Sequence, residues 1–316
     1  MPLVSLALPV HNGENYLAEA IRSILGQSFA DFELIITDNA SSDGTEAICR
    51  EFARADSRIR YHRNETNLGA AENFNLGFRL ASGELFKWCA HDDLLSPNYV
   101  EVCVAALEAN TRAVLAHGVQ RGIDAEGREN GWLSGDIRNI DGVDSAARRF
   151  KLVFTTQGYD VAMFGLMRAS ALGQTELHRK YYGSDIALLA ELALLGPFVS
   201  ASEAVFYNRE HPARSINAAD KRARQLWLDA KAQRVHGLEH VSLLGHLVAI
   251  AWKHRAAVPF RATVLPLAFW AGSPRQLARY GLELVGLLSP GLQGAARSLG
   301  RRLVQSAARL RAERQS

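Results

Sequence analysis

The stretch VSLALPVHNGENYLAEAIRSILGQSFADFELIITDNASSDGT, residues 4–45, contains the pattern that decides the fold. An apolar run of strand length ends at a polar turn, and Leu17, Ile21 and Ile24 then recur at helical spacing. A second apolar run, residues 32–38, ends in another polar turn and leads into a second helical pattern. Strands that are apolar at nearly every position are typical of a sheet covered on both faces. The stretch therefore predicts two strand–helix units of an α/β sheet.

The same alternation of strand and helix continues to about residue 120. Apolar runs predict further strands, and amphipathic runs between them predict helices, at residues 58–64, 67–83, 84–90, 91–110 and 113–119. This order predicts an α/β domain with a largely parallel sheet and right-handed crossovers. Later segments predict a loop or hairpin, then a turn with a helix, then a strand that ends in a polar loop: residues 123–139, 183–198 and 204–216.

Charge divides the chain of 316 residues into two parts. Residues 221–316 contain 16 basic and 4 acidic side chains, whereas residues 1–220 contain 20 basic and 29 acidic ones. The basic part is rich in helix-forming residues, and residues 292–314 repeat an amphipathic, arginine-rich pattern. We therefore predict a catalytic domain at 1–220 and a helical C-terminal region at 221–316.

The basic C-terminal region has two interpretations. It is either a helical layer whose charges are simply solvated, or a region that contacts an anionic membrane surface, which arginines beside Trp252, Phe260, Phe269 and Trp270 would suit. We do not expect nucleic acid as a partner, because the region lacks a recognised binding motif and residues 1–220 are acidic.

Cysteine content and hydropathy indicate where in the cell the protein is expected to be located. Three cysteines, Cys49, Cys89 and Cys103, are an odd number without metal-ligand spacing, which favours free thiols in a reducing environment. The first residues do not resemble a signal peptide, and no apolar run reaches the roughly 18 residues of a membrane span. We expect a cytoplasmic location, with peripheral contact to the cytoplasmic face of the inner membrane as the alternative that the basic region leaves open.

Polar side chains follow three of the predicted strands. His11 and Asn12 follow the first, Asp38 and Asn39 end the second, and Asp92 and Asp93 follow a later one. The carboxyl ends of parallel strands meet at one edge of the sheet, where such folds bind ligands. These side chains are therefore expected to lie along one edge.

The carboxylate pair Asp92 and Asp93 has two interpretations. It is either a helix cap with a first-turn acid, or a site for Mg²⁺ or Mn²⁺, which prefer oxygen ligands and are often held by one or two carboxylates plus substrate phosphates. Asp38 and Asn39 either cap a turn or recognise a nucleobase or ribose. The turn around Gly69 lets a backbone approach a ligand but is a weak motif.

Two later segments carry further candidates. Asp185 either caps the helix that it opens or serves as a general base presented at the helix start. Arg209, His211 and Arg214 form a dense cationic loop after a predicted strand, and such a loop is suited to phosphate.

Together, these stretches resemble the inverting glycosyltransferases of family 2, which have the glycosyltransferase A fold. The resemblance is carried by residues 4–45, quoted above, and by NLGAAENFNLGFRLASGELFKWCAHDD, residues 67–93, and it covers about residues 3–215. It implies a Rossmann-like, mainly parallel sheet flanked by helices, with the C-terminal helical region as an extension.

The resemblance also implies roles for individual residues. It places Asp93 on the metal ion, Mg²⁺ or Mn²⁺, and Asp185 at the position of the catalytic base. It implies a set of donor-binding residues along the sheet edge: Pro9, His11, Glu14, Asp38, Asn39, Gly69, Asn73, Asp92, Arg209 and His211. Asn39 stands where the family often has a second aspartate, which disfavours a UDP donor and leaves GDP- and dTDP-sugars open. His91 stands where the metal motif is often acidic, which would weaken metal binding.

The expected function is transfer of a sugar from a nucleotide sugar to a saccharide or lipid-linked acceptor, with inversion, in the synthesis of a cell-surface polysaccharide or glycolipid. A nucleotidyltransferase is a second hypothesis, but the turn at residues 11–14 lacks the glycine-rich basic loop that a triphosphate requires. The third is a non-catalytic nucleotide-sugar-binding or membrane scaffold protein of the same fold. The presence of both Asp93 and Asp185 disfavours this third hypothesis.

Overall fold

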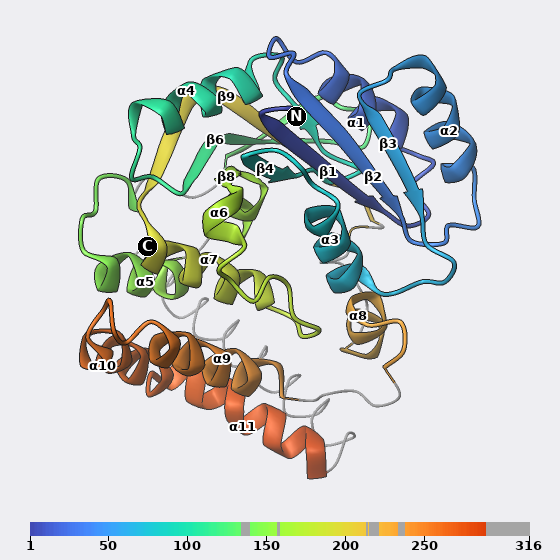
Figure 1. Ribbon diagram of the computed structural model, residues 1–316. Coiled ribbons are helices and arrows are strands. Elements are labelled where there is room, and N and C mark those ends of the chain that lie inside the picture. The colour runs from blue at the N-terminus through green and yellow to red at the C-terminus, as the bar shows by residue number, and fades with distance from the viewer. Residues whose placement is uncertain (134–139, 157–158, 213, 215–220, 233–237, 289–316) are drawn as a thin grey trace, which may run out of the picture.

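The computed structural model describes residues 1–133, 140–156, 159–212, 214, 221–232 and 238–288 (Figure 1). The amphipathic pattern predicted at residues 292–314 lies outside this part of the chain.

Nine strands in the described residues form one sheet, in the order β3-β2-β1-β4-β8-β6-β9-β5, with β7 paired to β6. Their bounds are β1 Val4–Val10, β2 Phe32–Asp38, β3 Ile59–Arg63, β4 Leu85–Trp88, β5 Leu94–Leu95, β6 Leu115–Ile123, β7 Glu129–Leu133, β8 Leu166–Arg168 and β9 Phe198–Arg209.

Strand direction follows from the pairings. β1 pairs in parallel with β2 and β4, and β2 pairs in parallel with β3. β8 is antiparallel to both β4 and β6, so β6 and its parallel partner β9 run in the same direction as β4. The predicted mainly parallel sheet is thus confirmed, and the short strands β5, β7 and β8 run against it. Within the segment expected to be a loop or hairpin, residues 123–139, β7 pairs antiparallel with the preceding strand β6, and residues 134–139 lie outside the described residues.

Helices cover both faces of the sheet and extend beyond it (Figure 1). The first group is α1 Leu17–Leu25, α2 Thr45–Ala55, α3 Ala70–Arg79, α4 Tyr99–Ala109, α5 Ala146–Thr155, the 3₁₀ helix η2 Tyr159–Phe164, α6 Ala169–Leu172 and α7 Ser184–Leu195. The C-terminal group is α8 Lys221–Leu228, α9 Glu239–Lys253, α10 Phe260–Ala271 and α11 Pro274–Leu288.

Two hydrophobic clusters lie on the two faces of the sheet. Leu6 and Leu8 of β1 pack in one cluster with residues of α1 and α4, whereas the intervening Ala7 belongs to the other cluster. This alternation follows from the period-two geometry of a strand. On the side of Ala7, a Cβ at Gly77 of α3 would stand only 2.8 Å from the Ala7 Cβ, so a glycine lets α3 approach β1 closely.

The C-terminal helices contribute side chains to the hydrophobic cluster that contains Ala7. Leu247 and Ile250 of α9 and Leu267 of α10 pack in it with residues of α5 and α7. The buried Glu191 of α7 accepts hydrogen bonds from Lys253 at 2.7 Å and from His254 at 2.9 Å. The predicted helical extension is confirmed, while the division at residue 220 stays a prediction.

Candidate active site

Four predicted residues meet where β4 and β9 end. The Asp92 carboxylate lies 2.9 Å from Nε2 of His211, and its main-chain oxygen accepts a hydrogen bond from Nε of Arg209. One carboxylate oxygen of Asp93 accepts the main-chain N–H of Arg209 at 2.8 Å, and Asn208 lies within 3.4 Å of both oxygens. Segments more than 100 residues apart in sequence are thus joined at the carboxylate pair.

Asp93 is buried, and its charge is costly there. Burial, and then the negative charge of Asp92, raise the pKa of Asp93 to about 8. A cavity of about 10 Å³, roughly the space of one water molecule, lies beside Asp93 and is lined also by Ser23, Cys89 and Phe206. A carboxylate pair of this kind would be stabilised in its ionised form by a bound cation.

Two residues of the α1 segment support this cluster. The Arg209 guanidinium is fully buried, lies 4.6 Å from the centre of the Tyr16 ring and is 2.6 Å from a carboxylate oxygen of Glu19. The ring of His211 lies 4.8 Å from that of Tyr16. Because Arg209 has these partners, it holds the end of β9 in place.

A network of amides lies beneath the end of β2. The Asn39 side chain donates to Asn67 at 2.8 Å and accepts from Asn64 and from the main-chain N–H of Leu68. Asn73 donates to the main-chain oxygen of Thr37 and accepts from the same Asn64 amide. An aspartate at position 39 could accept from Asn64 and Leu68 but could not donate to Asn67, so the contact with Asn67 is the one that requires an amide.

Asp38 completes its hydrogen bonds within the protein. It is fully buried, and it accepts from the main-chain N–H of Ser41 at 2.9 Å and from the Tyr61 hydroxyl at 2.7 Å. Arg63 lies 3.5 Å away. These contacts fit the turn-capping interpretation of Asp38, and its contact with a donor ribose or base stays a prediction.

The residues after β1 are more open. Pro9 pairs in register with Thr37 inside the sheet, but His11 and Glu14 are exposed. His11 lies 3.1 Å from the Asn67 amide, and Glu14 accepts the main-chain N–H of Gly44 at 2.6 Å. The ends of β1 and β2 are therefore tied to each other along the predicted donor edge.

Gly69 begins α3 in a backbone conformation that requires glycine. Its φ is +84°, and a Cβ there would stand 2.4 Å from the main-chain oxygen of Leu228 in α8. Gln225 of α8 also donates to the main-chain oxygen of Lys180, whose ammonium group lies 3.2 Å from Asp229. The start of the C-terminal region thus packs against the predicted donor loop.

Asp185 lies in the first turn of α7, after Gly183 in the left-handed conformation. The segment before it carries His178, whose ring lies 4.9 Å from that of Trp88, the last residue of β4. Asn75 of α3 holds the main chain of His178 with two hydrogen bonds. The start of α7 is therefore tied to the strand that leads to Asp92.

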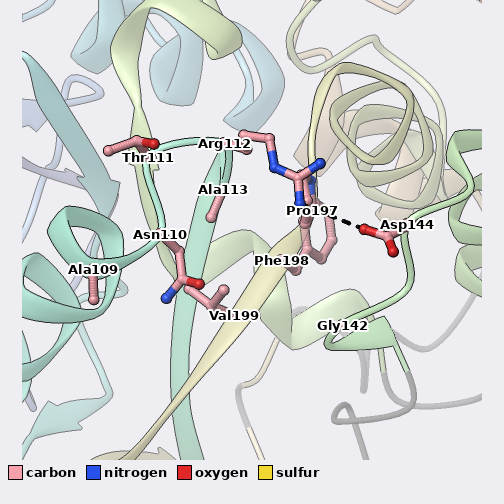
Figure 2. Close-up of a pocket in the computed structure, with 10 residues that line it drawn as sticks. All are labelled: Ala109, Asn110, Thr111, Arg112, Ala113, Gly142, Asp144, Pro197, Phe198 and Val199. Carbon is pink, nitrogen blue, oxygen red and sulfur yellow. Dashed lines mark ion pairs between the residues drawn. The ribbon is translucent and has the colours of Figure 1, made fainter.

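A larger cavity lies away from this edge. It has a volume of about 310 Å³ and is lined by the turn after α4, by Gly142 and Asp144, and by the start of β9 (Figure 2). Arg112 and Asp144 pair beside it at 3.6 Å. Phe198 at the start of β9 pairs with Leu115 and Arg209 at its end pairs with Ile123, so eight residue steps of β6 separate the two ends by roughly 26 Å. This cavity is therefore separate from the carboxylate cluster.

Comparison with protein families identifies the chain. The family model described as glycosyl transferase family 2 matches residues 5–174, more than half of the sequence. The chain belongs to glycosyltransferase family 2. The matched range of this family 2 chain includes the ends of β1, β2 and β4, but not Asp185 or the end of β9.

Curated relatives match shorter stretches of the family 2 chain. An uncharacterized glycosyltransferase of Rickettsia bellii is 37% identical over 130 residues, which are 40% of this chain and 18% of the relative. The glycosyltransferase GlyG of Streptococcus pneumoniae is 34% identical over 99 residues, 31% of this chain and 33% of the relative. The match thus spans at most a third of the length of these relatives.

Solved structures confirm the glycosyltransferase A fold. S. aureus TarS 1-349 in complex with UDP-GlcNAc superposes with a TM-score of 0.61 at 16% identity, covering 87% of this chain and 72% of that one. The mannosyltransferase PcManGT from Pyrobaculum calidifontis in complex with GDP-Man and Mn²⁺ gives 0.55 at 16% identity, covering 96% and 81%. At this identity the likeness establishes the fold.

The residues of this chain fit only part of the metal site that family 2 implies. Among the described residues no three His, Cys, Asp or Glu side chains form a metal-binding group. Asp93, with Asp92 adjacent, offers carboxylate oxygens of the kind that Mg²⁺ and Mn²⁺ prefer, and a diphosphate supplies the remaining ligands in many such sites. His91 packs its ring against Gly13, and burial lowers the pKa of His91, so it favours the neutral form.

Sequence reasoning missed several residues that build the family 2 site. Tyr16, Glu19 and Asn208 contact Arg209, His211 or Asp93, yet Tyr16 and Glu19 belong to a helical segment, and Asn208 immediately precedes the predicted cationic loop. The spacing of Tyr16 and Glu19 on one side of α1 was the available signal. Their partner Arg209, however, stands 190 residues from Glu19.

Proposed function

We propose that the chain transfers a sugar from a nucleoside-diphosphate sugar to a hydroxyl of a saccharide or lipid-linked acceptor, with inversion at the anomeric carbon. The proposal extends to the synthesis of a cell-surface polysaccharide or glycolipid. The observation that carries it is the buried carboxylate Asp93, held beside Asp92 by the end of β9 at the predicted donor edge.

Asp93 would hold the metal ion that binds the diphosphate of the donor, and Asp92 would meet the donor's sugar or ribose. Mg²⁺ or Mn²⁺ held by Asp93 would, when bound, neutralise charge on the departing nucleoside diphosphate. His211 is hydrogen-bonded to Asp92, and its imidazole is the group of this cluster proposed to donate to a phosphate oxygen. Arg209 acts through the main-chain oxygen of Asp92 and the carboxylate of Asp93, which accepts its main-chain N–H, because its guanidinium is buried among protein acceptors.

Asp185 is the proposed general base. A carboxylate in the first turn of α7 is stabilised as an anion by the helix dipole, and it can accept the proton of the acceptor hydroxyl. The oxygen then attacks the anomeric carbon on the face opposite the leaving diphosphate. One displacement inverts the configuration, and the proton ends on Asp185.

The competing function is donor binding without transfer. It shares the donor site but does not need Asp185. Replacing Asp185 by Asn therefore separates the two, since it removes the base while keeping size and polarity.

The first test is thermal unfolding with UDP-, GDP-, dTDP- and CMP-sugars, each with Mn²⁺ or with EDTA. A ligand that binds only the native state raises the melting temperature, so one nucleotide class should do so, and only with the metal. Asp93→Asn should abolish the shift, and Asp185→Asn should keep it. Asp144→Asn, whose side chain is 86% exposed beside the distant cavity, is the matched control.

Turnover completes the test. With the donor so identified, transfer or slow donor hydrolysis should fall by at least about 100-fold in Asp185→Asn. Stabilisation by a donor together with unchanged, negligible turnover in both proteins would favour the binding protein. If no donor of the panel stabilised the chain, the proposed function would be abandoned.

A further inference from the structure

The outer surface of the C-terminal helices exposes large apolar side chains. Trp252 at the end of α9 is 56% exposed, and Leu265 and Phe269 of α10 are 57% and 82% exposed. Leu265 and Phe269 are one helical turn apart, with Arg261 one turn before them, so the three side chains share one face of α10. We call Trp252, Arg255, Arg261, Leu265 and Phe269 the α10 face.

This apolar surface is additional to the core contacts of the same helices. Thr263 and Leu267 are the buried residues of α10, and Trp270 packs its ring against Phe154 of α5 at 5.3 Å. α10 is therefore already anchored to α5 through its inner side, and Phe269 and Leu265 point away from that contact. Figure 1 shows α9, α10 and α11 as a layer beneath α5 and α7.

The charges around the α10 face are all of one sign. Arg255 lies over the Trp252 ring at 4.1 Å, and Arg261 opens the exposed side of α10. The acidic side chains of α9, α10 and α11 are Glu239 and Glu283, and both are buried. The exposed surface of these helices, within the described residues, thus combines apolar and cationic groups with no carboxylate.

We propose that the α10 face docks on an anionic lipid surface. Its aromatic and aliphatic side chains would enter the headgroup region while Arg255 and Arg261 meet lipid phosphates, as in interfacial amphipathic helices. Among the described residues no helix has the length and apolar character to cross a membrane. Positive charge without exposed carboxylates favours this occupant over a second copy of the chain, whose equivalent face would carry the same charge.

The proposal is independent of the sugar-transfer reaction, since binding to lipid requires neither donor nor metal. The full-length chain is sedimented with vesicles of phosphatidylcholine alone or with 30% phosphatidylglycerol, at about 0.1 M and 0.5 M salt. We expect binding to the anionic vesicles at low salt and much weaker binding to the neutral ones.

Variants locate the contact. Each basic residue lost near an anionic surface weakens partitioning by about 5-fold, so Arg255→Gln with Arg261→Gln should weaken it by about 30-fold. Phe269→Glu should weaken it by at least about 10-fold. The matched control is Trp132→Ala on β7, an aromatic side chain that is 42% exposed, and it should leave partitioning unchanged.

Fluorescence quenching tests whether Trp252 itself contacts the lipid. Brominated lipids quench tryptophan fluorescence on contact, and Trp252→Phe should remove most of the quenching, whereas Trp132→Phe should not. Unchanged circular dichroism and melting temperature verify that each variant is folded.

Three outcomes would overturn the proposal. Anionic vesicles could fail to bind the chain. The variants of the α10 face could bind as tightly as the original protein, which would place the contact elsewhere, including in residues 289–316. Concentration-dependent dimerisation lost in Phe269→Glu, without vesicle binding, would identify a second copy as the occupant.

Discussion

His178 shows how one buried side chain makes stability depend on pH. Its ring lies between Trp88 and Phe74, and its Nε2 atom is buried without a hydrogen-bond partner in the described part of the chain. Burial lowers the pKa of His178 to about 4. The folded protein therefore holds a neutral imidazole that the unfolded chain would protonate near pH 6.5.

The sign of the pH effect follows from proton binding. Between pH 6.5 and 4 the unfolded state binds the additional proton, so the contribution of His178 to folding is fully present above pH 6.5 and falls as the pH drops. Lowering the pH from 7.5 to 5 should cost about 2 kcal/mol through this residue. In urea unfolding, the difference in the free energy of unfolding between pH 7.5 and pH 5 should be smaller by that amount in His178→Phe than in the original protein. The exposed His62→Gln is the control and should leave the difference unchanged.

Single residues also show what sequence could predict at the site. Asp92, Asp93 and Asp38 are conspicuous because carboxylates follow apolar strands. The function of the Asn39 amide cannot be read from the sequence in this way, because its partners Asn64 and Asn67 follow a different strand. Only the hydrogen bonds show that a donor is needed at position 39.

At the scale of elements, α3 and α8 meet at Gly69. Any other residue there would combine an unfavourable backbone conformation with a contact against the α8 main chain. Gly69→Ala should therefore destabilise the protein by at least about 2 kcal/mol and weaken donor binding, as α8 is pushed from the donor loop. Denaturant unfolding and donor titration measure both effects.

A glycine in open helix surroundings provides the comparison. A Cβ at Gly245 of α9 would meet nothing within 4 Å, so Gly245→Ala should be neutral or stabilise by up to about 1 kcal/mol. Equal stability of the two variants would show that Gly69 is not a packing contact of α8.

Elements differ in how far sequence predicts them. β1, β2, α1 and α2 follow from local periodicity, because each contains enough residues to display it. β5 and β8 have two and three residues, too few for a pattern, and they exist because neighbouring strands offer them partners. The ends of β4 and β9 are joined by such tertiary contacts, so their meeting at Asp93 was not evident from spacing.

At the scale of the whole molecule, the two parts separated by charge share one hydrophobic cluster. Leu247 of α9 is completely buried in it beside residues of α5 and α7. We therefore expect one calorimetric transition for the full chain, with both parts unfolding together.

Leu247→Ala tests this cooperativity. It should destabilise the entire molecule by about 3 kcal/mol, including the sheet. Leu265→Ala removes an equal side chain from an exposed position and should change stability by less than about 0.5 kcal/mol. Two separate transitions, with only the later residues affected by Leu247→Ala, would support independent domains instead.

The buried thiol of Cys89, beside the small cavity next to Asp93, also makes the site measurable by chemical labelling. Burial raises the pKa of Cys89 to about 11, so in the closed site it is a protonated, shielded thiol that reacts slowly with disulfide reagents. With Cys49→Ser and Cys103→Ser, the labelling rate of Cys89 would report how often the end of β4 opens. Donor with Mn²⁺ should slow it several-fold, and an unchanged rate would place donor binding away from β4. The labelling rate thus measures how fast the site opens, and the measurement can be made without knowing the acceptor.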